Sequence, residues 1–279
     1  AGWDVWNNGE IINKLVSVIL SAYNSEKTIE KSIESILSQS YQNFELLIMD
    51  DFSTDNTSLI LEKKYSDNKK IKLFKNSENL GLTKSLNYLI NNCHGDLIAR
   101  QDSDDISLSD RLMTQVRIVN KYNLDFCTTR ATRLDNNKYI PGLSRYIPKK
   151  LSIKLKNPFI HGTLMIKKNV IKDIGYYDEK FYFAQDYKLF IDLISRGYKY
   201  KDLMKSYYIL NTDNNISSNY KKQQEYYSNC ARKKIEPQNW KTIKHLSTTQ
   251  KNLGLQTDLD VNGINIIKKM LPGSRDLLH

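Results

Sequence analysis

Short apolar runs alternate with segments of helical periodicity over the first 122 residues. The runs LVSVILS (15–21), FELLIM (44–49), IKLF (71–74) and DLIAR (96–100) have the length and composition of strands buried in a parallel sheet. Between them, apolar residues recur at the spacing of one helical face, as in Ile29, Ile33 and Ile36. Strands that alternate with helices imply right-handed crossovers and a sheet covered on both faces. The pattern therefore predicts an α/β fold, a Rossmann-like three-layer sandwich around a mostly parallel central sheet.

The pattern changes in the second half of the chain. Beyond residue 122 the alternation gives way to turn-rich stretches such as LDNNKYIPG, and it returns with the strand-like TLMI and two further helices. From residue 211 onward the chain is polar, basic and rich in tyrosine, which predicts an appended helical tail. We therefore expect an N-terminal extension (1–14), one domain (15–210) with two halves (15–122 and 123–210), and a basic C-terminal tail (211–279).

Composition narrows the range of partners. The chain has 279 residues, 40% of them apolar, and a formal net charge of +11, so we expect a globular protein that attracts anions. Phosphates, anionic lipid surfaces and nucleic acid fit this charge, and scattered lysines that only maintain solubility fit it as well. The three cysteines match neither a disulfide framework nor a zinc pattern, and no apolar stretch reaches the ~18 residues of a membrane span. The expected location is the cytoplasm, with peripheral contact at the inner face of the plasma membrane as an open alternative.

Polar residues gather immediately after three of the predicted strands. The residues that follow are Ser21, Ala22, Tyr23 and Asn24 after the first strand, Asp50, Asp51, Ser53 and Asp55 after the second, and Gln101, Asp102, Ser103, Asp104 and Asp105 after the fourth. Ligands of an open α/β sheet collect beyond the carboxyl ends of its strands, so these segments are expected to form one acidic cleft. Such close carboxylates repel one another unless a cation neutralises them, and oxygen ligands select Mn²⁺ or Mg²⁺. A metal that bridges a diphosphate is one interpretation, and caps of the following helix at Asp104 and Asp105 are the other.

Four segments carry a distinctive combination of residues in a fixed order. SVILSAYN is a strand ending in Tyr-Asn, and LLIMDDFSTDNT is a strand ending in Asp-Asp-x-Ser-x-Asp. ENLGLTKSLN contains Asn-x-Gly, and ARQDSDD contains Asp-x-Asp. In this order they resemble the family 2 (GT-A fold) inverting glycosyltransferases of bacterial surface-glycan type. The resemblance runs from about Leu15 to Tyr208. It implies that 15–122 is a nucleotide-sugar-binding half and 123–210 an acceptor-binding half.

The resemblance also implies a role for the residues of the donor site. Tyr23 would stack on the nucleobase and Asp51 would accept a hydrogen bond from it, which suits an aromatic face and an acceptor-only carboxylate. Asp102 would hold the ribose or the sugar, and Asp104 would coordinate the metal that grips the diphosphate. The remaining residues expected at the nucleotide-sugar are Ser21, Ala22, Asn79, Ser103 and Lys84.

Three of these assignments have alternatives. The family more often has its cation two residues beyond Lys84, where this chain has Leu86, and a solvated surface lysine is the alternative. For Tyr23, the alternative is an ordinary aromatic side chain of the hydrophobic core. His161, in NPFIHGTLMI, is a candidate ligand of the metal beside Asp104 and Asp102, and a structural histidine is its alternative.

A catalytic base is expected in IGYYDEKFYFAQDYKLFIDL. This segment resembles the family segment in which a Glu-Asp pair opens a helix and its aspartate is the base. Here the pair is Gln185-Asp186, so Asp186 is the expected base, without a preceding carboxylate to raise its pKa. An N-cap is the alternative role for Asp186. Asp178 and Glu179 either line the acceptor pocket or are exposed turn residues.

The function that the resemblance implies is inverting, metal-dependent transfer of a sugar from a UDP-sugar to a glycan or lipid-linked acceptor in surface polysaccharide synthesis. A sugar nucleotidyltransferase shares the fold class, but the chain has no Gly-rich phosphate loop near its N-terminus. A non-catalytic nucleic-acid-binding module would use the basic tail, but no nucleic-acid motif is present and an acidic cleft repels a phosphate backbone. The tail has two further interpretations, contact with an anionic membrane and a solvated charged helix.

Overall fold

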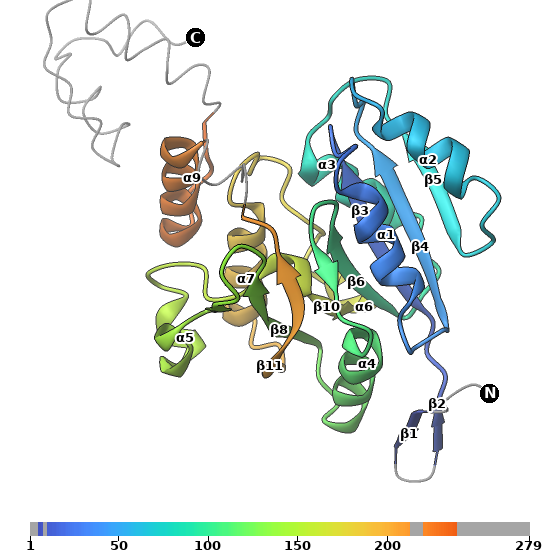
Figure 1. Ribbon diagram of the computed structural model, residues 1–279. Coiled ribbons are helices and arrows are strands. Elements are labelled where there is room, and N and C mark those ends of the chain that lie inside the picture. Colours follow the sequence, from blue (N-terminus) through green and yellow to red (C-terminus); the bar gives the residue numbers. More distant parts are fainter. Residues whose placement is uncertain (1–4, 8–9, 213–219, 239–279) are drawn as a thin grey trace, which may run out of the picture.

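The fold comes from a computed structural model, which describes residues 5–7, 10–212 and 220–238 (Figure 1). Near the N-terminus, β1 (Val5–Asn7) and β2 (Glu10–Ile12) pair as a small antiparallel sheet within the expected N-terminal extension. The rest of the described chain surrounds one large sheet.

In the described residues this sheet has nine strands. Four parallel strands form its first half in the order β5-β4-β3-β6, namely β3 (Val16–Ala22), β4 (Phe44–Asp50), β5 (Ile71–Lys75) and β6 (Leu97–Asp102). The antiparallel β10 (Met165–Lys167) joins them to a parallel pair, β8 (Phe126–Arg133) and β11 (Tyr200–Leu210). Two short antiparallel strands, β7 (Ile106–Ser107) and β9 (Tyr139–Ile140), pair with β11 and β8. Only these two and β10 run against the others, so the prediction of a mostly parallel sheet is confirmed.

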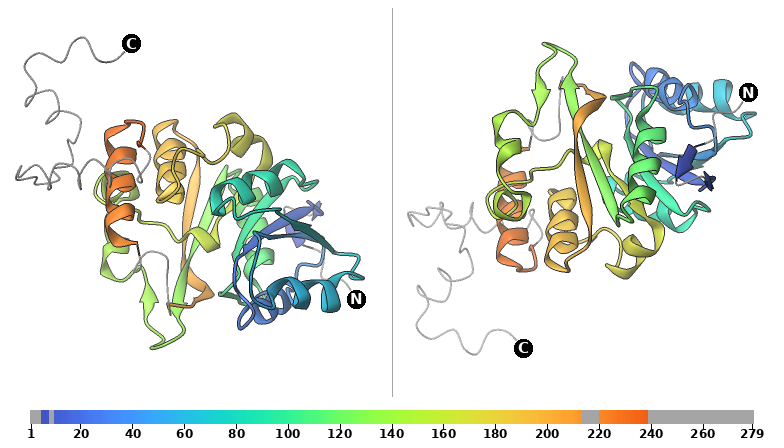
Figure 2. Two further views of the ribbon diagram at one scale, coloured as in Figure 1. Left: turned by 90° about the horizontal axis from the view of Figure 1, so that it is seen from above. Right: turned by 90° about the horizontal axis from the view of Figure 1, so that it is seen from below.

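Helices cover both faces of the sheet (Figure 2). One layer consists of α1 (Ile29–Leu37), α2 (Thr57–Tyr65) and α4 (Arg111–Lys121). The other contains α3 (Leu82–Asn91), α6 (Lys168–Asp173) and α7 (Gln185–Ser195). Side chains alternate along a strand, so Val18 and Leu20 of β3 pack in the first core and Ile19 packs in the second. The predicted three-layer sandwich is confirmed.

The connection between β9 and β10 is made of short helical turns. They are η1 (Leu143–Tyr146), α5 (Lys149–Ser152) and η2 (His161–Thr163). The connection leads from β9 to β10, which lies next to β6 and pairs with it directly.

A helix of the expected C-terminal tail packs on the domain. α9 (Lys221–Lys233) lies alongside α7, in orange beside yellow-orange in Figure 2. Tyr227, Cys230 and Ala231 are buried in the same core as α7. Residues 213–219 and 239–279 of that tail lie outside the described residues. Within the described ranges, no helix is long and apolar enough to cross a membrane.

Candidate active site

The carboxyl ends of β3, β4 and β6 lie side by side. Ala22 pairs in register with Asp50, and Ser21 pairs with Asp102 on the other side. The Asp51 N–H donates to the Ala22 carbonyl at 2.8 Å, which continues the pairing beyond the end of β4. Ser21 and Ala22 therefore form the floor between two acidic strand ends.

Asp51 holds the Asn-x-Gly segment against the end of β4. Its Oδ1 accepts hydrogen bonds from Asn76 Nδ2 (2.7 Å) and the Leu80 N–H (2.9 Å), and its Oδ2 accepts one from the Gly81 N–H (2.9 Å). Asp51 is only 2% exposed. A carboxylate has about four acceptor positions, so about one remains for a ligand. The hydrogen bond from a nucleobase stays a prediction, and organising this loop is a second role of Asp51.

The other residues expected at the donor surround this loop. Tyr23 is 49% exposed, which excludes the alternative of a core aromatic. Asn79 donates from Nδ2 to the Asp51 carbonyl at 3.3 Å. The Ser103 hydroxyl shares a 2.8 Å hydrogen bond with that of Ser25. Lys84 is exposed in the first turn of α3, and this position fits either of its two interpretations.

Asp104 and Asp105, which follow β6, both have raised pKa values beside Asp102. Burial and the charge of Asp102 raise the pKa of Asp104 to about 6. Burial, Asp102 and Asp104 raise the pKa of Asp105 well above its usual value. Asp105 is 2% exposed and accepts a hydrogen bond from the Asn211 N–H at 2.7 Å, so it also ties the end of β11 to the cluster. The cluster carries negative charge that a cation would stabilise.

The helix-cap alternative for these aspartates is wrong. The next helix, α4, begins at Arg111 and its N-cap residue is Asp110. The same alternative is wrong for Asp186, because the N-cap of α7 is Ala184.

Arg100 is a site residue that the sequence motifs did not single out. Its side chain is 1% exposed, and Nη2 donates to Asp102 Oδ1 at 2.6 Å. Its Nε has no hydrogen-bond partner among the described residues. One oxygen of Asp102 is therefore committed to a buried guanidinium, which leaves Oδ2 for a ligand. The signal in the sequence was a cation at the end of the apolar run DLIAR, a type rarely buried without a partner.

Gly162 leaves room beside its backbone for both Oδ2 of Asp102 and the hydroxyl of Tyr208. A Cβ atom at position 162 would lie 2.5 Å from Asp102 Oδ2 and closer still to Tyr208 Oη. The buried Tyr208 accepts a 3.1 Å hydrogen bond from the Asp102 N–H. Burial, Asp105 and Asp102 raise the pKa of Tyr208 well above its usual value, so its hydroxyl is neutral. Arg111 Nη1 donates to the Gly162 carbonyl at 2.7 Å and holds η2 in place.

His161 and Tyr177 bring the second half of the chain to the same cleft. His161 Nε2 and Tyr177 Oη share a 2.7 Å hydrogen bond. Burial and then Arg100 lower the pKa of His161, while Asp186 and Asp102 oppose this shift, so the imidazole is neutral at pH 7. Burial raises the pKa of Tyr177, which the same three charged groups also affect. The charges of Asp102 and Asp186 therefore both act on the His161–Tyr177 pair.

Asp186 lies in the first turn of α7, directly after Gln185. Its Oδ2 accepts a hydrogen bond from Asn157 Nδ2 at 2.7 Å. Ala184, the last residue before α7, has a left-handed backbone (φ 55°), which turns the chain into the helix. Asn157 therefore orients one carboxylate oxygen, and Oδ1 is available to a ligand.

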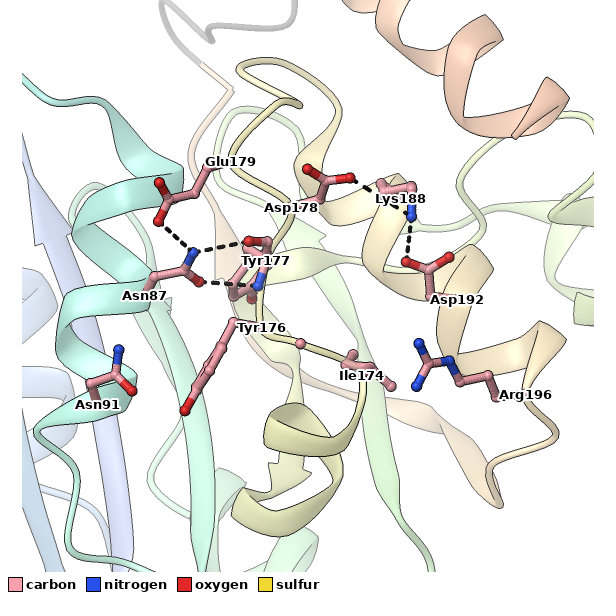
Figure 3. A pocket seen from close by; sticks show the side chains of 11 residues that line it. Asn87, Asn91, Ile174, Tyr176, Tyr177, Asp178, Glu179, Lys188, Asp192 and Arg196 are labelled. Carbon is pink, nitrogen blue, oxygen red and sulfur yellow. Dashed lines mark hydrogen bonds and ion pairs between the residues drawn. The ribbon is translucent and has the colours of Figure 1, made fainter. Parts of the chain in front are cut away.

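A cavity of about 490 Å³ lies between α3 and α7, away from the strand ends (Figure 3). Asp178 and Glu179 line it, but both contact neighbouring side chains. Glu179 Oε1 accepts from Asn87 Nδ2 at 3.0 Å, and Asp178 Oδ2 lies 4.0 Å from Lys188 Nζ. Tyr23, Asp51 and the aspartates after β6 do not line this cavity. Tyr177 also lines the cavity and hydrogen-bonds to His161, so the cavity borders the cleft without including the expected donor residues.

Comparison with known proteins identifies the family of this chain. The family model described as Glycosyl transferase family 2 matches residues 17–175, more than half of the chain. EpsE of Bacillus subtilis, named as a glycosyltransferase, is 35% identical over 71% of this chain and 73% of its own length. The UDP-Glc:alpha-D-GlcNAc-diphosphoundecaprenol beta-1,3-glucosyltransferase WfgD of Escherichia coli is 33% identical over 64% of this chain and 70% of its own.

A solved structure shares the fold. The crystal structure of S. aureus TarS 1-349 in complex with UDP superimposes with a TM-score of 0.62 at 21% identity, covering 77% of this chain. This chain spans 64% of the TarS chain, just under two thirds of its length.

Family membership decides between the functions that the sequence left open. A glycosyltransferase is an enzyme, which removes the non-catalytic nucleic-acid-binding module, and it transfers a sugar rather than a nucleotide, which removes the sugar nucleotidyltransferase. The motifs, the three-layer fold, the family model and the relatives agree: this chain is a glycosyltransferase and belongs to glycosyl transferase family 2.

Proposed function

We propose that this chain transfers a sugar from a UDP-sugar to a glycan or lipid-linked acceptor, with inversion at the anomeric carbon. The observation that carries the proposal is that the segment 157–162 contacts both carboxylates, because Asn157 hydrogen-bonds to Asp186 and Gly162 lies against Oδ2 of Asp102. A donor held at Asp102 then has a carboxylate from the other half of the chain in the same cleft. Inversion needs such a base across the sugar from the leaving diphosphate.

Four observations support a uridine nucleotide as donor. Tyr23 offers an exposed ring at the end of β3, and Asp51 retains about one acceptor position for the N–H of a base. The TarS structure that shares this fold is a complex with UDP, and the name of WfgD specifies UDP-Glc. We therefore assign the base to Tyr23 and Asp51, and the ribose or sugar to Asp102 with Ser103 and Asn79 nearby.

We further propose that Mn²⁺ or Mg²⁺ binds with the diphosphate at Asp104 and at Oδ2 of Asp102. In the described residues, no three His, Cys, Asp or Glu side chains form a metal site by themselves. These ions commonly bind one or two carboxylates and the substrate phosphates, so two aspartates fit the requirement. The raised pKa of Asp104 supports a cation there. Nε2 of His161 is hydrogen-bonded to Tyr177, so Nδ1 is its candidate metal-ligand atom. When bound, the ion supplies positive charge that stabilises the departing diphosphate.

In the proposed transfer step, the carboxylate of Asp186 acts as the base. The acceptor hydroxyl oxygen attacks the anomeric carbon, the bond from that carbon to the diphosphate oxygen breaks, and UDP leaves. The hydroxyl proton passes to Asp186 Oδ1, while Asn157 holds Oδ2. The proposed base thus works without a preceding carboxylate, because an amide orients it.

The relatives support a surface-glycan acceptor. WfgD is named for a diphosphoundecaprenol-linked acceptor and a β-1,3 linkage. A β-linkage from an α-linked donor is the result of inversion. We infer the same class of acceptor here, a glycan or lipid-linked glycan of surface polysaccharide synthesis.

The test is a transfer assay with a panel of UDP-sugars, Mn²⁺ and undecaprenyl-diphosphate-linked sugars. The anomeric configuration of the product, read from its proton NMR couplings, decides between inversion and retention. Asp186→Asn should lower kcat by about 10²- to 10⁴-fold, the usual contribution of a general base, with little change in UDP affinity. Asp192→Asn is the matched control, because Asp192 lies on the same helix and contacts Lys188. Full activity of Asp186→Asn, or a retained anomeric configuration, would contradict the mechanism.

We also propose peripheral contact with an anionic membrane through α9, whose sequence KKQQEYYSNCARK is basic and rich in tyrosine. Co-sedimentation with liposomes should increase with the fraction of anionic lipid. Binding that does not depend on anionic lipid would remove this proposal.

A further inference from the structure

We propose that the donor nucleobase is held in a two-sided aromatic slot, with Tyr23 on one side and Tyr182 on the other. This inference rests on the proposed function, because it assumes a nucleotide-sugar donor. It assigns a substrate-binding role to Tyr182, which precedes the proposed base by four residues and comes from the half of the chain expected to bind the acceptor.

Tyr182 lies directly over the Asn-x-Gly segment. A Cβ atom at Gly81 would lie 2.9 Å from Cε2 of Tyr182 and 3.3 Å from its Cζ, so the ring rests against the bare Cα of Gly81. Gly81 also has a positive φ of 86°, which favours glycine on backbone grounds. The close approach of ring and backbone therefore depends on glycine at this position.

Gly81 connects Tyr182 to the proposed base site. The Gly81 N–H donates to Asp51, and the Asp51 N–H donates to the carbonyl of Ala22, the residue before Tyr23. The chain of contacts thus runs from the Tyr182 ring through Gly81 and Asp51 to the start of the Tyr23 loop. Burial, Asp51, Tyr220 and Tyr23 raise the pKa of Tyr182, in agreement with Asp51 and Tyr23 lying near its hydroxyl.

Aromatic contacts of the neighbouring Phe183 anchor the loop that carries Tyr182. Phe183 contacts Tyr182 edge-on with ring centroids 5.2 Å apart, and it packs on Tyr220 (5.3 Å) and on Tyr227 of α9 (5.7 Å). The Phe181 carbonyl accepts a hydrogen bond from the Thr83 hydroxyl of α3 at 3.2 Å. The loop is therefore anchored on both sides while Tyr182 itself remains 54% exposed.

An exposed ring on an anchored loop is what base stacking requires. A flat base between two aromatic faces gains contact on both sides, and the rigid loop loses little conformational freedom when it binds. Tyr23 and Tyr182 are both about half exposed, although each belongs to a well-packed segment. Both have ring surface left for a base to cover.

The test measures binding of UDP with Mn²⁺ by isothermal titration calorimetry to the wild type, Tyr182→Leu and Tyr182→Phe. Tyr182→Leu should weaken UDP by about 10-fold, within the range for loss of one base-stacking ring, and Tyr182→Phe should retain the affinity. Binding of pyrophosphate with Mn²⁺, which has no base, should be the same for all three. Tyr122→Leu is the matched control, since Tyr122 is 47% exposed and ends α4, with its ring beside Lys201. Thermal unfolding of each variant checks that it is folded.

The outcomes separate this inference from the proposed function. Unchanged UDP affinity in a folded Tyr182→Leu variant overturns the slot but leaves the UDP-sugar donor intact. Equal losses of UDP and pyrophosphate also overturn it, because Tyr182 would then act on the diphosphate site. A wild-type protein that binds GDP or another nucleoside diphosphate instead of UDP contradicts the proposed donor, and the same variants then test the slot with that nucleotide. Binding of pyrophosphate but of no nucleoside diphosphate contradicts both.

Discussion

Replacing Gly162 with alanine would place a methyl group in the contact between Asp102 and Tyr208. The new Cβ atom would lie 2.5 Å from Asp102 Oδ2, and the Tyr208 hydroxyl oxygen would be nearer still. Neither side chain has an easy alternative position. Asp102 is paired with Arg100 through its other oxygen, and Tyr208 is fully buried.

The structure allows the size of the effect to be worked out. Ordinary contact with a Cβ atom begins at 3.4 Å, so the Asp102 carboxylate must retreat by about 1 Å. A displacement of about 1 Å at a reacting centre costs on the order of 10²-fold in rate, or about 2.7 kcal/mol of activation free energy. Overpacking destabilises a fold by about 1–3 kcal/mol, and removing a glycine from the unfolded chain offsets about 0.4–1 kcal/mol of this. The net destabilisation is then about 0–2.6 kcal/mol, so the loss in activation free energy should be at least as large as the loss of stability.

The assay is UDP release from a UDP-sugar under steady state, beside Tm and the Kd of UDP. Gly162→Ala should lower kcat/KM by about 10²-fold and lower Tm by a few degrees. The double variant Gly162→Ala with Tyr208→Phe removes the nearest oxygen and should recover part of the lost rate. Gly162→Ala with near wild-type kcat/KM would refute the reasoning, because Asp102 would then tolerate the displacement. A double variant no faster than Gly162→Ala would show that the Tyr208 hydroxyl is not the obstacle.

Three further predictions concern pH, metal and the C-terminal helix. Burial alone would raise the pKa of Glu45, but hydrogen bonds, led by that from Lys72, lower it to about 2. The ionised Glu45 therefore contributes about 3 kcal/mol to the free energy of unfolding above pH 4.5, and this contribution is lost as the pH falls toward 2. In urea unfolding, Glu45→Gln should therefore be less stable than the wild type at pH 7, with a smaller difference at pH 3, and an equal difference would contradict this. Asp104→Ala should abolish the rise in Tm that Mn²⁺ produces in the presence of UDP, and an undiminished rise would exclude Asp104 as a ligand. Tyr227→Leu removes the ring contact with Phe183 and should destabilise the fold by about 1–3 kcal/mol with a lower kcat, whereas an unchanged urea midpoint would mean that α9 contributes little.

Much of the donor half follows from local sequence patterns. The run FELLIM predicts the strand observed as Phe44–Asp50, and DLIAR predicts the strand observed as Leu97–Asp102. Strand and helix periodicity depends on residues a few positions apart, so a single sequence contains it. The carboxyl ends of neighbouring parallel strands meet at one edge, so the joint position of Asp51 and Asp102 also followed.

The pairing within the site did not follow in this way. The motif identified Asp102 as a ligand of the donor, but the salt bridge from Arg100 depends on how a buried side chain packs beneath it. The role of Gly162 depends on a strand that begins 38 residues later, at Tyr200. No local pattern contains the contact of Gly162 with Tyr208, because the two residues lie on elements far apart in the sequence.

The tail illustrates the same difference. Its composition predicts a basic helix, and α9 is one. The prediction rested on charge and did not include the apolar face of this helix. Tyr227 and Cys230 lie three residues apart and form a short apolar face that packs on the core of the domain. Two of the aromatic contacts that anchor the loop before Asp186, those of Phe181 and Phe183 with Tyr227, come from this face.

The sequence by itself determined the three-layer fold, the family and the acidic strand ends, because these depend on periodicity and on motifs of adjacent residues. Only the tertiary structure decided that Asn157 orients Asp186 and that Tyr182 covers Gly81. The physical reason is the separation along the chain. Asn157 is 29 residues from Asp186, and side chains so far apart meet only when packing of the core and hydrogen bonding of the backbone have placed their elements.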